Sequence, residues 1–344
     1  MKLGWLRPFS LPVAMVLLMG LPAAPAVAAT DNQYTVHPLV SNVAGMAPHT
    51  DANLVNGWGL TASAASPWWV ADNGTSVSTL YRADGSTPGL VVQVPTHPTG
   101  TVFWATGPAR FVFDTEAGQV RGWPGSGTVT VVLADRSAVG AIYKGLALAT
   151  TTSGDRFYAT DFHNARVDVF DASFTLVTTA GAFEDSDLPS GYAPFGIQTI
   201  GSRIFVTYAK QDADAEDEIH GQGKGFVDVY DTSGSLLGRV AQHGQLDAPW
   251  GLALAPANFG RFSGDLLVGN FGDGRINAYE EGANGKFEHR GELRDGDSRP
   301  ISIDGLWALQ FGHGAPNNGP TNTLFFTAGP NDESDGLFGS ITAP

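Results

Sequence analysis

Short apolar stretches of strand length recur along this chain, and turn-forming residues separate them. The clearest example lies between residues 249 and 280. There an apolar run at 251–254 is followed by a second run at 265–270 and an alternating run at 275–279. Gly272–Asp273–Gly274 separates the last two runs, and glycine beside aspartate between alternating segments is a strong hairpin signal. Three strands cannot bury both of their faces alone, so this pattern predicts similar units packed beside it.

The same order of strands and turns repeats over most of the sequence. The copies start near matching glycines, which are Gly59, Gly145, Gly196, Gly251 and Gly305. The last three intervals are 51, 55 and 54 residues, whereas the first is 86 and leaves room for a degenerate copy at 101–135. A repeat of this size made of short strands is typical of β-propellers, with one four-stranded blade per repeat. The sequence therefore predicts an all-β fold, a six-bladed β-propeller.

The two ends of the chain are expected to close the ring together. The last repeat lacks a fourth strand after Ile341, while residues 34–40 near the N-terminus alternate like a strand. Pro38 cannot donate a ladder hydrogen bond, which favours the edge of a sheet for that stretch. We therefore predict that the N-terminal strand completes the last blade by pairing with residues 337–341. Closure of this kind removes two open sheet edges.

The first 28 residues have the features of a cleaved secretory signal peptide. Lys2 and Arg7 precede an apolar run at 11–21, and Ala26–Val27–Ala28 offers a small-residue cleavage site. The apolar run is too short to span a bilayer, and a retained N-terminal anchor is the less favoured alternative. We expect a single propeller domain at 30–344 with no transmembrane segment in the mature chain. Export to the periplasm or the extracellular space follows from the signal.

Composition narrows the classes of partner. The chain has 34 acidic and 19 basic residues, a formal net charge of −15, which argues against nucleic acid and anionic membranes as partners. It contains no cysteine, so disulfides, thiol nucleophiles and thiolate metal sites are excluded. The fold must be held by burial and ring closure, and we expect a monomer.

Individual repeats resemble those of NHL-type six-bladed propellers. The whole chain resembles a bacterial family of exported, functionally uncharacterised propeller proteins, many of which end in an exosortase (PEP-CTERM) sorting tail. The stretches that carry the resemblance are NGWGL (56–60), WVADNG (69–74), STLYRADG (78–85), YKGLA (143–147), GYAPF (191–195), VTYAKQD (206–212), PWGLALAP (249–256), FSGDLLVGNFGDGRINAY (262–279), DGLWAL (304–309) and FTAGPNDESDGLFGSI (326–341). The resemblance implies a fold and no particular reaction. Because this sequence reaches Pro344 without an apolar segment and basic tail, sorting by that route is not expected.

One mouth of the central channel is the expected ligand site. In a propeller, the turns between second and third strands gather there with the loops that lead into first strands, and a concave mouth is the default binding site. The candidate ligand-binding residues are Asp72, Lys144, Asp161, His163, Tyr208, Trp250, Asn270 and Asp304. Aspartate and asparagine also occur in turns because they tolerate left-handed backbone, and a single histidine in a turn is usually solvated. Trp58 and Trp250 either pack between blades or form a stacking platform.

A second candidate is the acidic segment 212–218, inside an insertion at 211–225 between the second and third strands of the fourth blade. Its five carboxylates with His220 could bind a hard cation through oxygen ligands. The segment lacks the spacing and turn glycine of an EF-hand loop, so a solvated acidic loop is the favoured interpretation.

Three function classes stay open. The leading hypothesis is a binding module that recognises a small ligand, a glycan or a protein through one face. The alternative is a metal-assisted hydrolase or lyase at the channel mouth, for which a divalent cation such as calcium would be the cofactor. That alternative rests on analogy with other propeller enzymes. The third is a purely structural surface protein.

Overall fold

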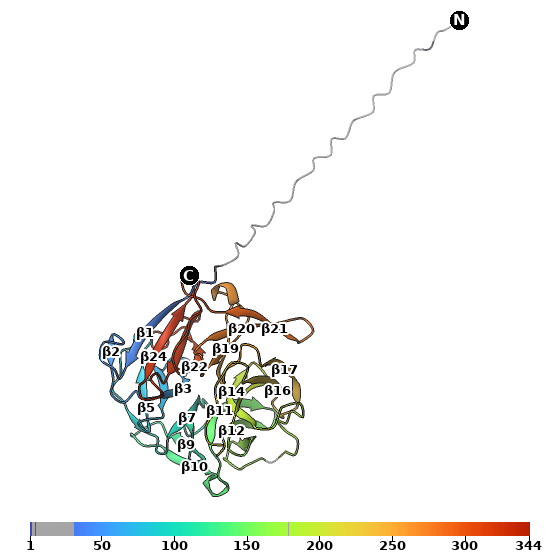
Figure 1. Cartoon of the computed structure of the whole chain (residues 1–344). Helices are drawn as coiled ribbons and strands as arrows, with labels where there is room; N and C mark the ends of the chain where they lie inside the picture. Colours follow the sequence, from blue (N-terminus) through green and yellow to red (C-terminus); the bar gives the residue numbers. More distant parts are fainter. Residues whose placement is uncertain (2–3, 5–30, 178) are drawn as a thin grey trace. The chain divides into compact units, whose positions relative to one another are not determined.

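Six β-sheets follow one another around a common axis, as predicted (Figure 1). The computed structural model describes residues 1, 4, 31–177 and 179–344, so the predicted signal peptide lies outside the described residues. Within the described part of the chain, the only helical segments are two single turns of 3-10 helix, η1 (Ser137–Val139) and η2 (Gly260–Phe262). No helix of that part is long and apolar enough to cross a bilayer. The all-β, six-bladed prediction is confirmed.

In each of the first five blades the strands are arranged in chain order from the axis outward. The first three blades contain β3 (Gly57–Thr61), β4 (Trp68–Asp72), β5 (Val77–Tyr81) and β6 (Val92–Gln93); β7 (Pro98–Phe103), β8 (Phe111–Thr115), β9 (Gln119–Trp123) and β10 (Val131–Asp135); and β11 (Tyr143–Thr151), β12 (Gly154–Asp161) and β13 (Arg166–Asp171). The last three contain β14 (Tyr192–Ile200), β15 (Arg203–Lys210), β16 (Phe226–Asp231) and β17 (Leu236–Gln242); β18 (Pro249–Leu254), β19 (Leu266–Asn270), β20 (Ile276–Glu281) and β21 (Phe287–Glu292); and β22 (Leu306–Phe311), β23 (Thr323–Ala328), β24 (Leu337–Thr342) and β1 (Thr35–Ser41), with β2 (His49–Thr50) at the edge. The sixth blade differs, because β1 lies outside β24.

The N-terminal strand closes the ring, as predicted. β1 pairs antiparallel with β24, from Thr35 opposite Thr342 to Ser41 opposite Leu337. The register shifts between Pro38 and Val40, next to the residue that has no backbone N–H to contribute. Tyr34 anchors the start of the strand, because its buried hydroxyl donates a 3.0 Å hydrogen bond to the carbonyl of Phe259. The first and last strands therefore share one blade.

The third blade departs from the four-stranded plan. Its sheet contains three strands among the described residues, and the chain beyond β13 makes only one bridge, between Phe170 and Leu176. Val177 then donates a 2.7 Å hydrogen bond to the carbonyl of Val169. Further along, Phe183 is buried against Tyr158 and Tyr230, in contact with the fourth blade. The chain thus crosses toward the fourth blade instead of completing the third.

The hydrophobic core is divided among the interfaces between blades. Six clusters of buried side chains lie in the described residues, and each combines neighbouring blades. Phe113 of the second blade packs on Trp69 of the first, for example, and Phe157 of the third packs on Trp104 of the second. Burial of one large apolar side chain contributes roughly 1.5–3 kcal/mol, so the faces of adjacent blades hold the ring together without disulfides.

The repeated glycines allow the innermost strands to approach one another. A Cβ on Gly196 would lie 2.1 Å from the carbonyl oxygen of Trp250 in the next blade, and one on Gly251 would lie 2.4 Å from that of Trp307. Gly59 and Gly145 meet the backbone of Thr99 and Phe195 in the same way. The glycine period found in the sequence therefore reflects the crowding of backbones around a narrow axis.

We expect Gly196→Ala to lower the free energy of unfolding by about 1–3 kcal/mol, because the added methyl meets rigid backbone that must move. Gly238→Ala is the matched control, since a Cβ there meets no atom within 4 Å and the backbone is not left-handed. Urea unfolding of both variants measures the difference. Equal stabilities for the two variants would contradict the close approach of β14 and β18.

Candidate functional site

Six equivalent positions, one in the innermost strand of each blade, lie at irregularities of the strand pairing. Every innermost strand has this register irregularity at the same place, where one residue in the fifth blade and two residues in each other blade fall outside the pairing. Bulges of this kind redirect side chains. The first residue of the irregularity in each blade is Trp58, Thr99, Lys144, Phe195, Trp250 or Trp307. Two of the sequence candidates, Lys144 and Trp250, thus occupy equivalent positions at the axis.

The aromatic members of this set pack against one another at the axis. Trp58 stacks on Trp307 at 3.6 Å between ring centroids and meets Phe195 and Trp250 edge-on at 6.3 and 6.2 Å. Phe271, which follows β19, stacks on Trp307 with 4.2 Å between ring centroids. Trp58 is 2% exposed and Trp250 is 9% exposed. This burial favours a role in packing between blades over a role as a stacking platform for a ligand.

Lys144 is the charged member of the set and is buried. Its side chain is 1% exposed, and Nζ lies 2.6 Å from Oε1 of Glu116 and 3.1 Å from Oδ1 of Asp217. The ammonium also lies 5.2 Å from the ring centre of Trp58, a distance at which a cation is attracted to an aromatic face. Burial acts to lower the pKa of Lys144, but the carboxylates of Glu116, Glu218 and Asp217 outweigh it and raise that pKa.

Two asparagines extend the network around this lysine. Asn73 Nδ2 donates to Oε2 of Glu116 at 2.9 Å, and Asn56 Nδ2 donates to Oε2 of Glu333 at 2.5 Å. Trp307 Nε1 donates to Oδ1 of Asn56 at 2.9 Å, which joins the network to the aromatic layer. Glu116 and Asp217 thus contact Lys144 directly, and Asn73 and Asn56 join Glu333 to them through hydrogen bonds. We call this set, Asn56, Asn73, Glu116, Lys144, Asp217, Glu218 and Glu333, the mouth cluster.

The carboxylates of the mouth cluster differ in their affinity for protons. Burial would raise the pKa of Glu116, but Lys144 and the hydrogen bonds from Asn73 and Lys144 lower it below its usual range. Burial raises the pKa of Glu218 to about 8, with Lys144 opposing the shift and Glu333 adding to it. Burial raises the pKa of Glu333 as well. At neutral pH the cluster thus contains an ionised carboxylate and a protonated carboxylic acid around one ammonium.

This assignment predicts a pH dependence of stability. A carboxyl whose folded pKa is raised from 4.5 to about 8 favours the folded state below 4.5, and that contribution is lost as the pH rises toward 8. Glu218→Gln should remove it, so the stability of the variant relative to the parent should increase between pH 5 and pH 8.5. The slope is at most about 1.4 kcal/mol per pH unit for one proton. Urea unfolding across that range is the measurement, and a constant difference would mean that Glu218 is ionised throughout.

Several other candidates from the sequence are buried and form hydrogen bonds with backbone groups of neighbouring strands and loops. Asp72, Asp161 and Asn270 end β4, β12 and β19 and are fully buried. Asp72 accepts a hydrogen bond from the backbone of Thr79 at 2.8 Å, and Asn270 donates to the carbonyl of Gln245 at 2.7 Å. Asp161 accepts from the backbone N–H of Ile142 at 3.3 Å.

Asp161 is also held by charge and side-chain hydrogen bonds. Its Oδ2 pairs with Nη2 of Arg166 at 3.2 Å and accepts from Nδ2 of Asn164 at 2.8 Å. Asp114, one residue before the end of β8, accepts from the backbone of Gly100 at 2.6 Å. These partners fit the turn-forming role that the sequence left as an alternative.

The remaining candidates lie in three different places. Tyr208 is buried with the core between the third and fourth blades, and its hydroxyl is 2.6 Å from that of Tyr230. His163 Nδ1 lies 3.2 Å from the carbonyl of Ala215, so it contacts the acidic insertion. Asp304 is exposed and accepts a 2.9 Å hydrogen bond from the backbone of Asn331. The structure therefore brings Lys144 and Trp250 together and leaves these three outside the mouth cluster.

Sequence reasoning did not select Asn56, Glu116 or Glu333, although one signal pointed to Glu116. The residue that follows each second strand is Asn73, Glu116, Phe162 and Phe271 in the first, second, third and fifth blades. All four of these residues contact the channel network or its aromatic layer. Aligning this position across the repeats would have found Glu116. The contact between Asn56 and Glu333 joins residues 277 positions apart and has no local signature.

The residues at the mouth do not fit the divalent-cation hypothesis. No group of three or more His, Cys, Asp or Glu side chains in the described residues has an arrangement that could hold a metal ion. The carboxylates that approach one another at the mouth instead surround the ammonium of Lys144. The acidic insertion contributes Asp217 to that lysine, so one of its carboxylates has a partner within the chain. We therefore derive no chemistry through a metal.

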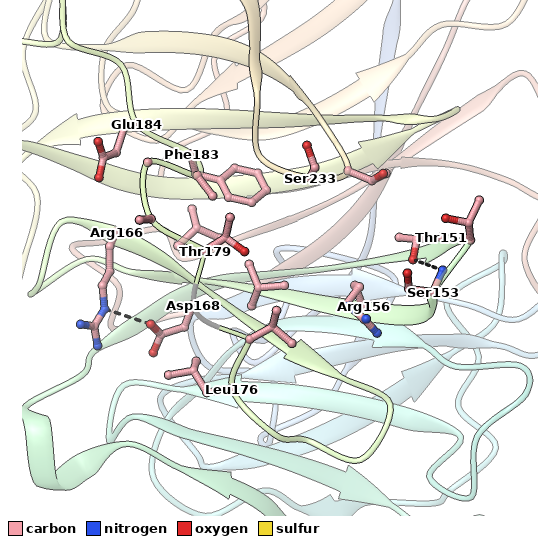
Figure 2. A pocket seen from close by; sticks show the side chains of 18 of the residues that line it. Thr151, Ser153, Arg156, Arg166, Asp168, Leu176, Thr179, Phe183, Glu184 and Ser233 are labelled. Carbon is pink, nitrogen blue, oxygen red and sulfur yellow. Dashed lines mark hydrogen bonds and ion pairs between the residues drawn. The ribbon is translucent and has the colours of Figure 1, made fainter.

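A surface groove of about 500 Å³ lies away from the mouth, beside the third blade where its sheet stops at three strands (Figure 2). Arg166 of β13 points into it and pairs with Asp168 at 2.9 Å, while Thr179 and Phe183 form the facing wall (Figure 2). None of the eight sequence candidates lines this groove. It follows from the incomplete blade and plays no part in the mouth cluster.

Comparison with known proteins gives relatives in one virus. No protein-family model matches the chain. It is 32% identical to Uncharacterized protein R648 of Acanthamoeba polyphaga mimivirus over 334 residues, which cover 90% of this chain and 80% of that protein. It is 30% identical to Uncharacterized protein L690 of the same virus over 339 residues, covering 90% of this chain and 85% of that protein.

Solved structures of low identity share the fold. A streptogramin B lyase is 11% identical with a TM-score of 0.53, covering 90% of this chain and 98% of that chain. A structure named as a gluconolactonase is 18% identical with a TM-score of 0.50, covering 72% of this chain and 79% of that chain. These two likenesses concern the propeller alone, whereas the identity to the viral proteins extends over most of both sequences. The chain therefore belongs to the same protein family as the mimivirus proteins R648 and L690.

Proposed function

We propose that the mouth cluster is an acid–base site, and that the protein is a hydrolase or lyase acting on a small polar substrate there. The observation that carries this proposal is the pairing of the buried ammonium of Lys144 with carboxylates from the second and fourth blades. Hydrogen bonds through Asn73 and Asn56 join Glu333 of the sixth blade to this pair. Bringing several carboxylates together with a lysine is costly unless the arrangement is well paired, and perturbed groups of this kind concentrate at functional sites.

Each member of the cluster has a chemical role in this proposal. Glu116, whose pKa is lowered, is ionised and acts as the general base. Glu218, whose pKa burial raises to about 8, is protonated near neutral pH and acts as the general acid toward the leaving group. Lys144 stabilises negative charge that develops on the substrate between them. Asn56 and Asn73 orient the carboxylates through their amide groups.

The comparisons give limited support to this class of activity. The lyase and the structure named as a gluconolactonase have the same propeller architecture, and their names describe a lyase and a lactone hydrolase. A shared fold at such low identity gives weak support to hydrolase or lyase chemistry and does not indicate a substrate. The substrate of this protein is therefore left at the level of a small polar ester, lactone or related molecule.

A non-catalytic binding module is the second candidate. It is favoured by the aromatic layer of Trp58, Trp250 and Trp307, which packs at the axis against the mouth cluster. Exposed or partly exposed aromatic and polar groups at one face would suit recognition of a glycan or protein surface. In that case Lys144 and its carboxylates would stabilise the ring and contact the ligand.

We infer that the mature chain acts after export. The inference rests on the basic, apolar and small-residue pattern of residues 1–28 and on the resemblance to exported bacterial propellers. Mass spectrometry of the N-terminus of protein recovered from the periplasm or medium tests it. A chain that retains Met1 in the cytoplasm would contradict export.

The experiment that tests the catalytic proposal measures proton release in a pH-stat with p-nitrophenyl acetate, gluconolactone and a streptogramin B as probes. Glu116→Gln and Glu218→Gln are the test variants. Asp214→Asn is the control, because Asp214 is exposed in the same insertion. We expect turnover of at least one probe, loss of about 10²-fold or more in each test variant, and no change in the control. No turnover by the parent, or equal turnover by parent and test variants, would favour the binding module.

A further inference from the structure

A second polar site lies on the fifth blade, beside the N-terminal segment. A groove of about 330 Å³ is lined by four arginines and one histidine, Arg261, Arg275, His289, Arg290 and Arg294. Arg261 belongs to the η2 turn, Arg275 precedes β20, His289 and Arg290 lie on β21, and Arg294 follows it. The last of these is fixed in place by the N-terminal segment, because Tyr34 donates a 2.7 Å hydrogen bond to the carbonyl of Arg294. The groove is therefore built from one blade and the strand that closes the ring.

The charge in this groove is unusual for the molecule. The whole chain has 34 acidic and 19 basic residues, yet Glu292 is the one carboxylate among the residues that line the groove. Glu292 is shared, since Oε1 lies 2.6 Å from Nη2 of Arg294 and Oε2 lies 3.4 Å from Nη1 of Arg275. Arg290 pairs outside the lining with Glu280 at 2.5 Å. The lining thus combines four guanidinium groups with a single carboxylate.

Arg261 is the least engaged of the four. Among the described residues its side chain has no ion pair, and its guanidinium carbon lies 5.9 Å from the ring centre of Phe262. Arg275 is held loosely, at 3.4 Å from Glu292 and 3.7 Å from Asp273. Like charges brought together in this way repel one another unless an anion lies between them. The guanidinium of Arg261 is therefore available to such an anion, and that of Arg275 is only partly engaged.

We propose that this groove is a binding site for a small oxyanion, either free or as the charged group of a sugar. The planar fork of an arginine side chain matches the paired oxygens of phosphate, sulfate and carboxylate groups, with two parallel hydrogen bonds. Glu292 orients Arg275 and Arg294, and Arg261 of the η2 turn contributes a further guanidinium to the lining. His289 hydrogen-bonds through Nε2 to Oδ1 of Asn277 at 3.2 Å, which fixes its ring beside the site.

Calorimetric titration with inorganic phosphate, inorganic sulfate, glucuronate and a sugar phosphate tests the site at about 0.15 M NaCl, where screening suppresses non-specific attraction. Arg261→Ala is the test variant, and Arg110→Ala, which removes an exposed arginine from the second blade, is the matched control. We expect one binding site per chain in the parent and in Arg110→Ala. Affinity should fall about tenfold or more in Arg261→Ala, because a charge-assisted hydrogen bond is lost.

The four probes identify the source of the anion. Equal affinity for free phosphate and the sugar phosphate means that a free ion is the ligand, and tighter binding of the sugar phosphate or glucuronate means that a sugar carries the charge. Arg261 is a surface residue on a short turn, so its replacement should leave the unfolding midpoint unchanged. Absence of binding to every probe, or equal weakening by Arg261→Ala and Arg110→Ala, would overturn the proposal.

Discussion

Replacement of Lys144 by methionine is expected to lower the free energy of unfolding by about 3–5 kcal/mol, the range seen when one partner of a buried ion pair is removed. The side chain is 1% exposed and lies 2.6 Å from the carboxylate of Glu116. Methionine retains the length and apolar stem of lysine, so the loss isolates the ammonium. Without it, the ionised carboxylate of Glu116 has no cationic partner in a partly dehydrated site.

Lys210→Met is the matched control, because Lys210 is exposed at the end of β15. Urea unfolding at pH 7 should place this variant within about 0.5 kcal/mol of the parent. The double variant Lys144→Met/Glu116→Gln should recover part of the lost stability, since it removes the carboxylate left without a partner. A loss of less than about 1 kcal/mol in Lys144→Met would mean that the ammonium contributes little net stability.

Deletion of residues 30–41 is expected to have the second large effect. The deletion removes β1, which pairs with β24 over its whole length, and two nearly fully buried side chains, Tyr34 and Val40. It exposes the edge of β24, and an open edge strand pairs readily with other chains. We expect a lower melting temperature and concentration-dependent aggregation.

His37→Ala is the control for this deletion. His37 lies on β1, and its side chain makes only an exposed hydrogen bond to Thr342, so the replacement keeps every backbone pair of the strand. Differential scanning calorimetry and size-exclusion chromatography measure the two effects. A deletion variant that melts with the parent and stays monomeric would show that the ring is closed elsewhere.

The periodic features of this fold could be predicted from sequence because they arise from local rules. Alternating apolar and polar residues predicted the strands, and glycines in turns predicted the hairpins. The repeat of glycines predicted six blades, since each blade needs a small residue where the innermost strands approach one another. The pairing of β1 with β24 followed from counting strands in the last repeat. No local sequence pattern indicated that the sheet of the third blade would contain three strands. The chain that follows β13 is directed instead by a tertiary contact, between Phe183 and Tyr230.

The site was less predictable, and Asp304 shows why. It precedes Gly305, which matches the repeated glycines in sequence, but the irregularity of β22 lies at Trp307 and Ala308. Alanine replaces the glycine in this blade, so the sequence pattern matched the wrong pair of residues. In the third blade the glycine is present, and the irregularity of β11 lies at Lys144 and Gly145, as the sequence pattern placed it.

The partners of Lys144 illustrate a different limit. Glu116, Asp217 and Glu333 come from three other blades, far apart in sequence, and residue type alone cannot show which of 34 acidic residues meet. Tyr208 illustrates the converse, since its repeat position resembles that of mouth residues while its side chain turns to the core between blades. Convergence at the axis depends on side-chain direction, which the pattern of apolar residues does not specify.

The central claim is that the positive charge at the channel mouth is the ammonium of Lys144 and not a metal ion. Elemental analysis of the purified mature protein, after dialysis without chelator, measures this most directly. We expect no divalent metal in stoichiometric amount and an unchanged melting curve when a chelator is added. One calcium, magnesium or zinc ion per chain, with a melting temperature that falls on chelation, would contradict the claim.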